Sequence, residues 1–141
     1  MDDKLPGRLA ACAARARRRA YAPYSGFTVG AAVLTDGGEI FSGCNIENAS
    51  YPAGICAERT ALFGAVSAGA RGFTAMALIG GKAGEDPADH CVPCGMCLQA
   101  MAEFCGPDFV IYMVKNENDV QARRLGEMLP TRFGGPGKDG E

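Results

Sequence analysis

The chain has 141 residues, of which 48% are hydrophobic, and a formal net charge of −2 at pH 7. This length and apolar content predict a single domain over residues 1–141, with flexible ends at residues 1–4 and 134–141. The mixed charges give no electrostatic reason to expect nucleic acid or an anionic membrane as a partner, so a small-molecule ligand is favoured.

The first residues lack the basic start, apolar run and small-residue cleavage site of a secretory signal. No apolar stretch reaches the roughly 18 to 20 residues that a membrane helix needs. The seven cysteines are an odd number, which, without a signal, argues against a disulfide framework. We therefore expect a soluble, cytoplasmic protein in which cysteines bind metal or fill the core.

A first helix is predicted over about residues 6–21, because Leu5, Leu9 and Ala13 recur at four-residue spacing. Its polar face carries a group of arginines: Arg15, Arg17, Arg18 and Arg19. No aromatic residues interleave with them, so a solvated helix face is favoured over a nucleic-acid patch.

Two strands, over residues 27–34 and 39–46, flank an Asp-Gly-Gly turn and predict an antiparallel hairpin. A helix follows over residues 55–68, with Gly69 in the position of a C-terminal cap. The continuous apolar run at residues 73–80 is typical of a buried strand in a parallel sheet.

A further helix is expected from residue 93 or 94 to 105, then a strand over residues 109–114 and an edge strand over residues 120–124. This order of elements predicts the α/β class, with helices on both faces of a sheet that contains parallel crossovers.

Three cysteines have the spacing of a catalytic zinc site. Cys56 lies two residues before Glu58, and Cys94 and Cys97 form a PCxxC motif 38 positions further on. Three thiolates can hold one zinc ion and leave the fourth position open for water. Because each group of ligands lies at the predicted start of a helix, two helix dipoles would favour the thiolates.

Glu58 is the candidate catalytic residue. Zinc lowers the pKa of a bound water toward about 7, and Glu58 would take its proton and pass it to the substrate. A solvated glutamate at a helix N-terminus is the alternative, but its position beside Cys56 favours catalysis. Arg59, on the same helical face as Cys56, can donate to a ligand thiolate and offset the negative charge of the site.

Five segments of the sequence closely resemble the small homotetrameric cytidine deaminases. They are YAPYSGF at residues 21–27, VGAA at 29–32, GCNIENA at 43–49, CAERTA at 56–61 and PCGMC at 93–97. The resemblance extends over residues 21 to about 133. It implies a three-layer α/β/α fold with a mixed five-stranded sheet and one zinc per subunit. It also implies hydrolysis of cytidine and 2′-deoxycytidine to uridine and 2′-deoxyuridine with release of ammonia, in pyrimidine salvage.

The resemblance also implies the nucleoside contacts. Asn45 and Glu47 would bind the ribose hydroxyls, Phe27 would pack on the base, and Phe133 would reach in from a neighbouring subunit of a homotetramer. Three further positions match the family near the active site or the subunit junction: Ala49, Tyr51 and Ala57.

Two departures from the family pattern leave alternatives open. Leu98 follows the last cysteine where the family commonly has arginine, so a modified cytosine nucleoside, such as an antibiotic or a 5-substituted cytidine, is an alternative substrate. A four-ligand structural zinc site completed by His90 or Cys91 is a further alternative, although an exposed His90 and a buried Cys91 are the simpler interpretations. A non-catalytic module that binds zinc or nucleoside is the alternative of another class.

Overall fold

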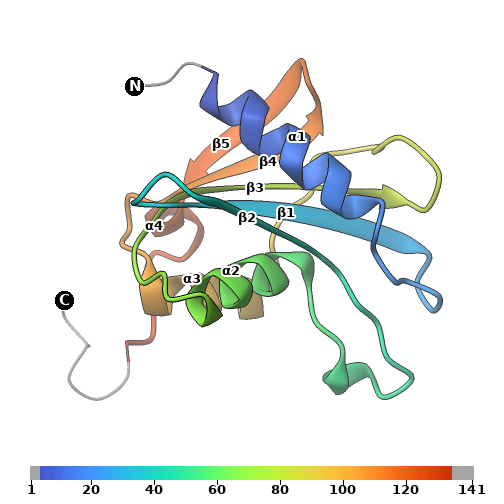
Figure 1. The fold of residues 1–141 in the computed structure, drawn as a ribbon, viewed down its shortest axis with the longest axis horizontal. Coiled ribbons are helices and arrows are strands. Elements are labelled where there is room, and N and C mark those ends of the chain that lie inside the picture. Colours follow the sequence, from blue (N-terminus) through green and yellow to red (C-terminus); the bar gives the residue numbers. More distant parts are fainter. Residues whose placement is uncertain (1–3, 135–141) are drawn as a thin grey trace.

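The structure is a computed structural model that describes residues 4–134 (Figure 1). The predicted flexible ends therefore lie almost wholly outside the described residues. The helices are α1 (Leu5–Arg17), α2 (Ala57–Ser67), α3 (Gly95–Phe104) and the short α4 (Leu125–Met128), with a 3-10 turn η1 at Tyr51–Ala53. The strands are β1 (Phe27–Thr35), β2 (Ile40–Cys44), β3 (Phe73–Lys82), β4 (Val110–Asn116) and β5 (Asp119–Arg124).

The strands form one mixed five-stranded sheet in the order β2-β1-β3-β4-β5. Strands β3 and β4, which α3 connects, run parallel, and every other neighbouring pair runs antiparallel. The predicted hairpin and mixed sheet are confirmed. The prediction that the run at residues 73–80 belongs to a parallel sheet holds only on the β4 side, because β1 pairs with β3 in the antiparallel direction.

Helix α1 covers one face of the sheet and helices α2 and α3 cover the other (Figure 1). The buried residues of β3 alternate between these two layers: Ala75 and Ala77 pack in the cluster with α1, while Met76 and Leu78 pack in the cluster with α2 and α3. This alternation follows from the two-residue period of a strand. The predicted three-layer α/β/α architecture is therefore confirmed.

Two glycines let the helices approach the sheet closely. A Cβ added at Gly30 in β1 would lie 1.9 Å from the carbonyl oxygen of Ala13 in α1, and one at Gly43 in β2 would lie 2.6 Å from the backbone nitrogen of Ala61 in α2. Any larger residue would push the helix away from the strand. These contacts set the height of both helix layers above the sheet.

Two helix boundaries differ from the prediction. Helix α1 ends at Arg17 rather than near residue 21, because the backbone of Tyr21 pairs with the chain after β2: the Tyr21 amide donates to the Asn45 carbonyl at 3.0 Å, and the Glu47 amide donates to the Tyr21 carbonyl at 2.8 Å. Helix α2 begins at Ala57 rather than residue 55, because Ile55 pairs with Ile46. These pairings bring the turn at residues 22–26 beside the start of α2.

Within residues 4–134, no helix combines the length and the apolar character needed to span a membrane.

Candidate metal centre and adjoining cleft

Three cysteines gather where two helices begin. Cys56 is the N-cap of α2, Cys94 is the N-cap of α3, and Cys97 lies in the first turn of α3. Their sulfur atoms all lie within 4.8 Å of one another. Thiolates that share one zinc ion at about 2.3 Å stand roughly 3.8 Å apart, so this cluster fits a zinc ion held by three cysteines.

The surroundings of Cys56 favour its thiolate. A hydrogen bond from the Cys97 thiol is the largest cause that holds the pKa of Cys56 well below its usual range, and Arg59 lowers that pKa further. The Arg59 guanidinium reaches the Cys56 sulfur at an N···S distance of 3.7 Å. The pKa of Cys97 is raised, because Cys97 keeps the proton that it shares with Cys56. The N-termini of α2 and α3 add a positive field at the same point.

Glu58, in the first turn of α2, is one of the two buried polar side chains within residues 4–134, with 5% of its surface exposed. Burial raises the pKa of its carboxyl group, and the negative charge of Cys56 raises it further. A carboxyl group of this kind, beside a metal site, can accept and return a proton near neutral pH.

Neither candidate for a fourth protein ligand joins the three cysteines. In the described part of the chain, the only group of potential ligands at metal-binding spacing is Cys56, Cys94 and Cys97. The Nε2 atom of His90 lies 2.7 Å from an Asp119 carboxylate oxygen, and only 14% of the side chain is exposed. The expectation of an exposed His90 is therefore wrong, because the first residue of β5 supplies a carboxylate partner that lies 29 positions away in the sequence.

Cys91 and Leu98 lie in apolar surroundings. Burial raises the pKa of the Cys91 thiol to about 12. Leu98 is 8% exposed and packs in the cluster between α2, α3 and the sheet. Leu98 thus fills the core, and the guanidinium that hydrogen-bonds the thiolate cluster is that of Arg59.

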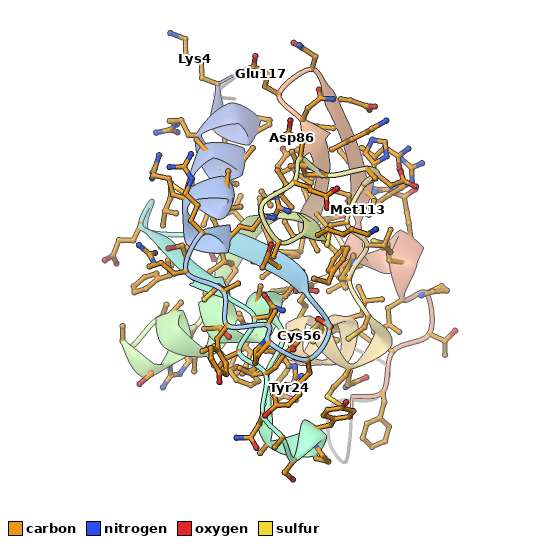
Figure 2. All side chains as sticks on the ribbon, turned by 90° about the vertical axis from the view of Figure 1, so that its right-hand side faces the viewer. Lys4, Tyr24, Cys56, Asp86, Met113 and Glu117 are labelled. Carbon is orange, nitrogen blue, oxygen red and sulfur yellow. The ribbon has the colours of Figure 1, made fainter. Side chains whose placement is uncertain are left out.

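A cleft of about 410 Å³ opens beside Cys56. Of the predicted site residues, five line it: Asn45, Glu47, Tyr51, Cys56 and Arg59. Tyr24 lines it too and meets the Tyr51 ring edge-on, with ring centroids 6.1 Å apart. Figure 2 shows Cys56 and Tyr24 together, on the side of the sheet away from α1.

Glu47 and Asn45 are fixed at the wall of this cleft. The Glu47 carboxylate accepts hydrogen bonds from the Tyr24 and Ser25 amides, both at 3.0 Å, and from the Ser25 hydroxyl. The Ser25 hydroxyl bond is the largest cause that lowers the pKa of Glu47. The Asn45 side-chain oxygen accepts from the Val29 amide at 2.8 Å, and its NH2 group donates to the Phe27 carbonyl at 2.9 Å. Each side chain keeps hydrogen-bonding capacity for a ligand.

The remaining predicted residues lie outside this cleft. Phe27, 44% exposed, lines a second cavity of about 310 Å³ together with Gly80 and His90. Phe133 is 71% exposed and lines neither cavity, although its carbonyl accepts a hydrogen bond from Gln99. Ala49 is exposed and Ala57 is fully buried.

The sequence analysis missed the roles of two residues. Ser25 belongs to the segment YAPYSGF, but its bond to Glu47 joins positions 22 apart. Arg17 was interpreted as part of a solvated helix face, and this is wrong: its guanidinium is hydrogen-bonded to the backbone at residues 28, 82 and 85. The available signal is the position of Arg17 four residues after Ala13, on the stripe that Leu5 and Leu9 begin, a position that the neighbouring arginines do not share.

The family model of the cytidine and deoxycytidylate deaminase zinc-binding region matches residues 5–113. The chain is 44% identical to the cytidine deaminase of Sporosarcina psychrophila over 119 residues, 84% of each chain. It is 46% identical to that of Halalkalibacterium halodurans over 121 residues, 86% of this chain and 88% of the relative. Its structure is similar to the crystal structure of cytidine deaminase from Burkholderia pseudomallei, with a TM-score of 0.82 and 43% identity over 90% of this chain and 98% of the other.

Proposed function

Since the chain belongs to the cytidine and deoxycytidylate deaminase zinc-binding family, we propose that it hydrolyses cytidine and 2′-deoxycytidine to uridine and 2′-deoxyuridine with release of ammonia. The observation that carries this proposal is the position of a buried carboxyl group, that of Glu58, next to a cluster of three thiols. The cluster adjoins a cleft whose wall holds the Glu47 carboxylate and the Asn45 amide.

The cluster of Cys56, Cys94 and Cys97 would hold the zinc ion. When bound, zinc supplies a Lewis acid that makes a water molecule reactive at neutral pH. The Glu58 carboxylate takes a proton from the attacking water and delivers it to ring nitrogen N3, then passes a proton to the departing amine. A C–O bond forms and the C–N bond breaks at C4 of the base, so water and cytidine become uridine and ammonia.

The polar wall of the cleft would bind the sugar. The Glu47 carboxylate, which its lowered pKa keeps ionised, would accept from a ribose hydroxyl, and Asn45 would supply an amide hydrogen. Phe27 would pack on the face of the base. Tyr51 and Ala49, which are exposed, would contact the nucleoside or a neighbouring subunit, and the fully buried Ala57 would contribute to the nucleoside site from its place between Cys56 and Glu58.

We further propose a homotetramer in which neighbouring subunits complete each active site. Among the exposed aromatic side chains of the described residues are Tyr24 at 52%, Tyr51 at 75% and Phe133 at 71%. Exposed aromatic residues are typical of interfaces. Phe133, which lines no cavity of its own subunit, would reach the cleft of another. The proposed setting is pyrimidine salvage in the cytoplasm.

The deciding experiment is a substrate panel on one preparation of the protein with its zinc content measured. Cytidine, 2′-deoxycytidine and several modified cytosine nucleosides would be compared by the ultraviolet change on deamination. Dominant turnover of a modified nucleoside would support the alternative that Leu98 raised, and bound zinc without ammonia release would support a binding module. Light scattering on the same sample measures the oligomeric state.

A further inference from the structure

The side chain of Arg17 joins three separate parts of the backbone on the α1 side of the sheet. Its Nε donates to the Thr28 carbonyl at 3.1 Å and to the Thr28 hydroxyl at 3.0 Å. Its Nη2 donates to the Lys82 carbonyl at 2.9 Å and to the Glu85 carbonyl at 2.8 Å. One guanidinium therefore ties the end of α1 to the start of β1 and to the chain that leaves β3.

The backbone is shaped to admit this side chain. A Cβ added at Gly81 would lie 2.8 Å from Arg17 Nη2, and one at Gly30 would lie 2.5 Å from the Arg17 backbone nitrogen. The Thr28 hydroxyl, which accepts from Arg17, donates in turn to the Gly81 carbonyl at 3.2 Å. These contacts form a network in which the planar, always charged guanidinium spans acceptors that no shorter side chain could reach together.

One of the segments that Arg17 holds, the start of β1, also contains Phe27. Phe27 precedes Thr28, and successive strand residues point to opposite faces, so Phe27 lies on the side of α2 and α3. A Cβ at Gly80 would lie 3.0 Å from the Phe27 ring and 3.1 Å from the Cys91 sulfur. The Phe27 ring thus rests on β3, close to Cys91 from the loop over residues 83–93 that leads to Cys94.

The same loop is held at its far end by His90, whose ring contacts Asp119. Residues 83–93 are therefore fixed by Arg17 where the loop begins and by His90 near the point where it enters α3. The cavity of about 310 Å³ lies between these two anchors, with Phe27 in its wall. Phe27 shares the wall of this cavity with loop residues such as Glu85 and His90, so a displaced loop would change the surroundings that orient the ring.

We propose that Arg17 is a positioning residue for nucleoside binding: acting through Thr28 and the loop over residues 83–93, it sets the orientation of Phe27 against the base. This inference rests on the proposed function, in which Phe27 packs on the base. Arg17 touches neither the nucleoside nor the metal cluster. Its loss should therefore weaken nucleoside binding and leave the zinc content and the proton transfer by Glu58 intact.

The test compares Arg17→Met, which keeps the stem but removes all donors, with Arg17→Lys, which keeps one charged donor group. Arg18→Met, at the next and exposed position, is the matched control. For each variant, KM and kcat for cytidine, the Kd for uridine by calorimetry, the zinc content and hydrogen–deuterium exchange of peptides over residues 83–93 are measured below the Tm.

We expect Arg17→Met to raise KM and the uridine Kd by on the order of tenfold, with kcat and zinc content near the wild-type values. Peptides over residues 83–93 should exchange faster, while those from α2 stay unchanged. Arg17→Lys should fall between Arg17→Met and the wild type, and Arg18→Met should match the wild type.

Unchanged KM and Kd with only a lower Tm would overturn the inference and leave Arg17 a purely structural residue, as would unaltered exchange in the loop. A variant that does not fold would be replaced by Thr28→Val, which removes one acceptor of the same network. A wild type inactive on every cytosine nucleoside would defeat the proposed function alone, since the exchange data and uridine Kd still decide the role of Arg17.

Discussion

The Ser25 side chain and backbone both bind the carboxylate of Glu47, the hydroxyl through one oxygen and the amide through the other. This contact joins two residues that lie 22 positions apart in the sequence, and it fixes a negatively charged hydrogen-bond acceptor at the wall of the cleft. The lowered pKa of Glu47 means that the group stays ionised to a lower pH than an ordinary glutamate.

Replacement of Ser25 by alanine should weaken sugar binding. Ser25→Ala removes the main cause of the lowered pKa, so the Glu47 pKa should rise toward the usual value of about 4.3. As the pH falls, Glu47 then loses its charge sooner, and the rise of KM on the acid side should begin at a higher pH than in the wild type. At neutral pH Glu47 stays ionised in both proteins, but the lost hydrogen bond no longer holds its carboxylate in place, so we expect a KM for cytidine raised about three- to tenfold with an unchanged kcat. Ser67→Ala, at the exposed end of α2, is the control, and an acid limb that does not move would contradict the assigned contact.

Glu58→Gln should separate metal binding from catalysis. Glutamine keeps the shape of the side chain but cannot take up the proton, so kcat should fall by roughly 100-fold to 10,000-fold. The zinc content should remain at one per subunit. Glu117→Gln is a matched control because Glu117 lies in the β4–β5 turn, at the opposite end of the molecule from Cys56 (Figure 2). Near-normal turnover by Glu58→Gln would remove Glu58 from the mechanism.

Loss of one thiol should release the metal. Cys94→Ser replaces a thiolate by a weak ligand, and we expect the purified protein to lose most of its zinc, its activity and part of its thermal stability. Metal analysis and a thermal melt, each with and without added zinc, measure the effect. Cys12→Ser alters a cysteine in α1 on the other face of the sheet and should keep its zinc. Full zinc occupancy in Cys94→Ser would contradict the three-cysteine centre.

Two glycine-to-alanine changes should act in opposite directions. Gly30→Ala places a methyl group 1.9 Å from the Ala13 carbonyl oxygen, and separating α1 from β1 should cost about 2–4 kcal/mol, a fall in Tm on the order of 10 °C. Gly64→Ala adds a methyl group in the interior of α2 where no atom lies within 4 Å, and should stabilise the protein by about 0.5–1 kcal/mol. Calorimetry of both variants tests the close packing of α1, and a neutral Gly30→Ala would show that this contact is loose.

Local patterns in the sequence were sufficient for the elements and their order, while the mixed five-stranded sheet was implied by the family resemblance. The hairpin around the Asp-Gly-Gly turn and the layers of α1 and α2 follow from spacings of two, three and four residues, because such spacings decide which face of an element is apolar. The antiparallel pairing of β1 with β3 could not be read in this way, since a strand buried on both faces looks alike in either direction.

Polar side chains were harder to place than apolar ones. Arg17 continues the four-residue spacing of Leu5, Leu9 and Ala13 and Arg18 does not, yet this spacing does not reveal that the Arg17 guanidinium reaches carbonyl groups 65 and 68 positions away. His90 likewise finds its partner at the start of a distant strand, β5. Which polar groups turn inward depends on tertiary contacts that no local spacing encodes. The roles of Phe27, Asn45 and Glu47 toward a nucleoside stay predictions.

The two N-cap cysteines, Cys56 and Cys94, stand 38 positions apart in the sequence. A metal that binds both closes a loop of that length, as a disulfide would, and opposes unfolding through the lost freedom of the enclosed chain. Since that loop contains all of α2 and β3, the free energy of unfolding should vary with the logarithm of the free zinc concentration. The abundance of the folded protein would then report the zinc supply of its surroundings.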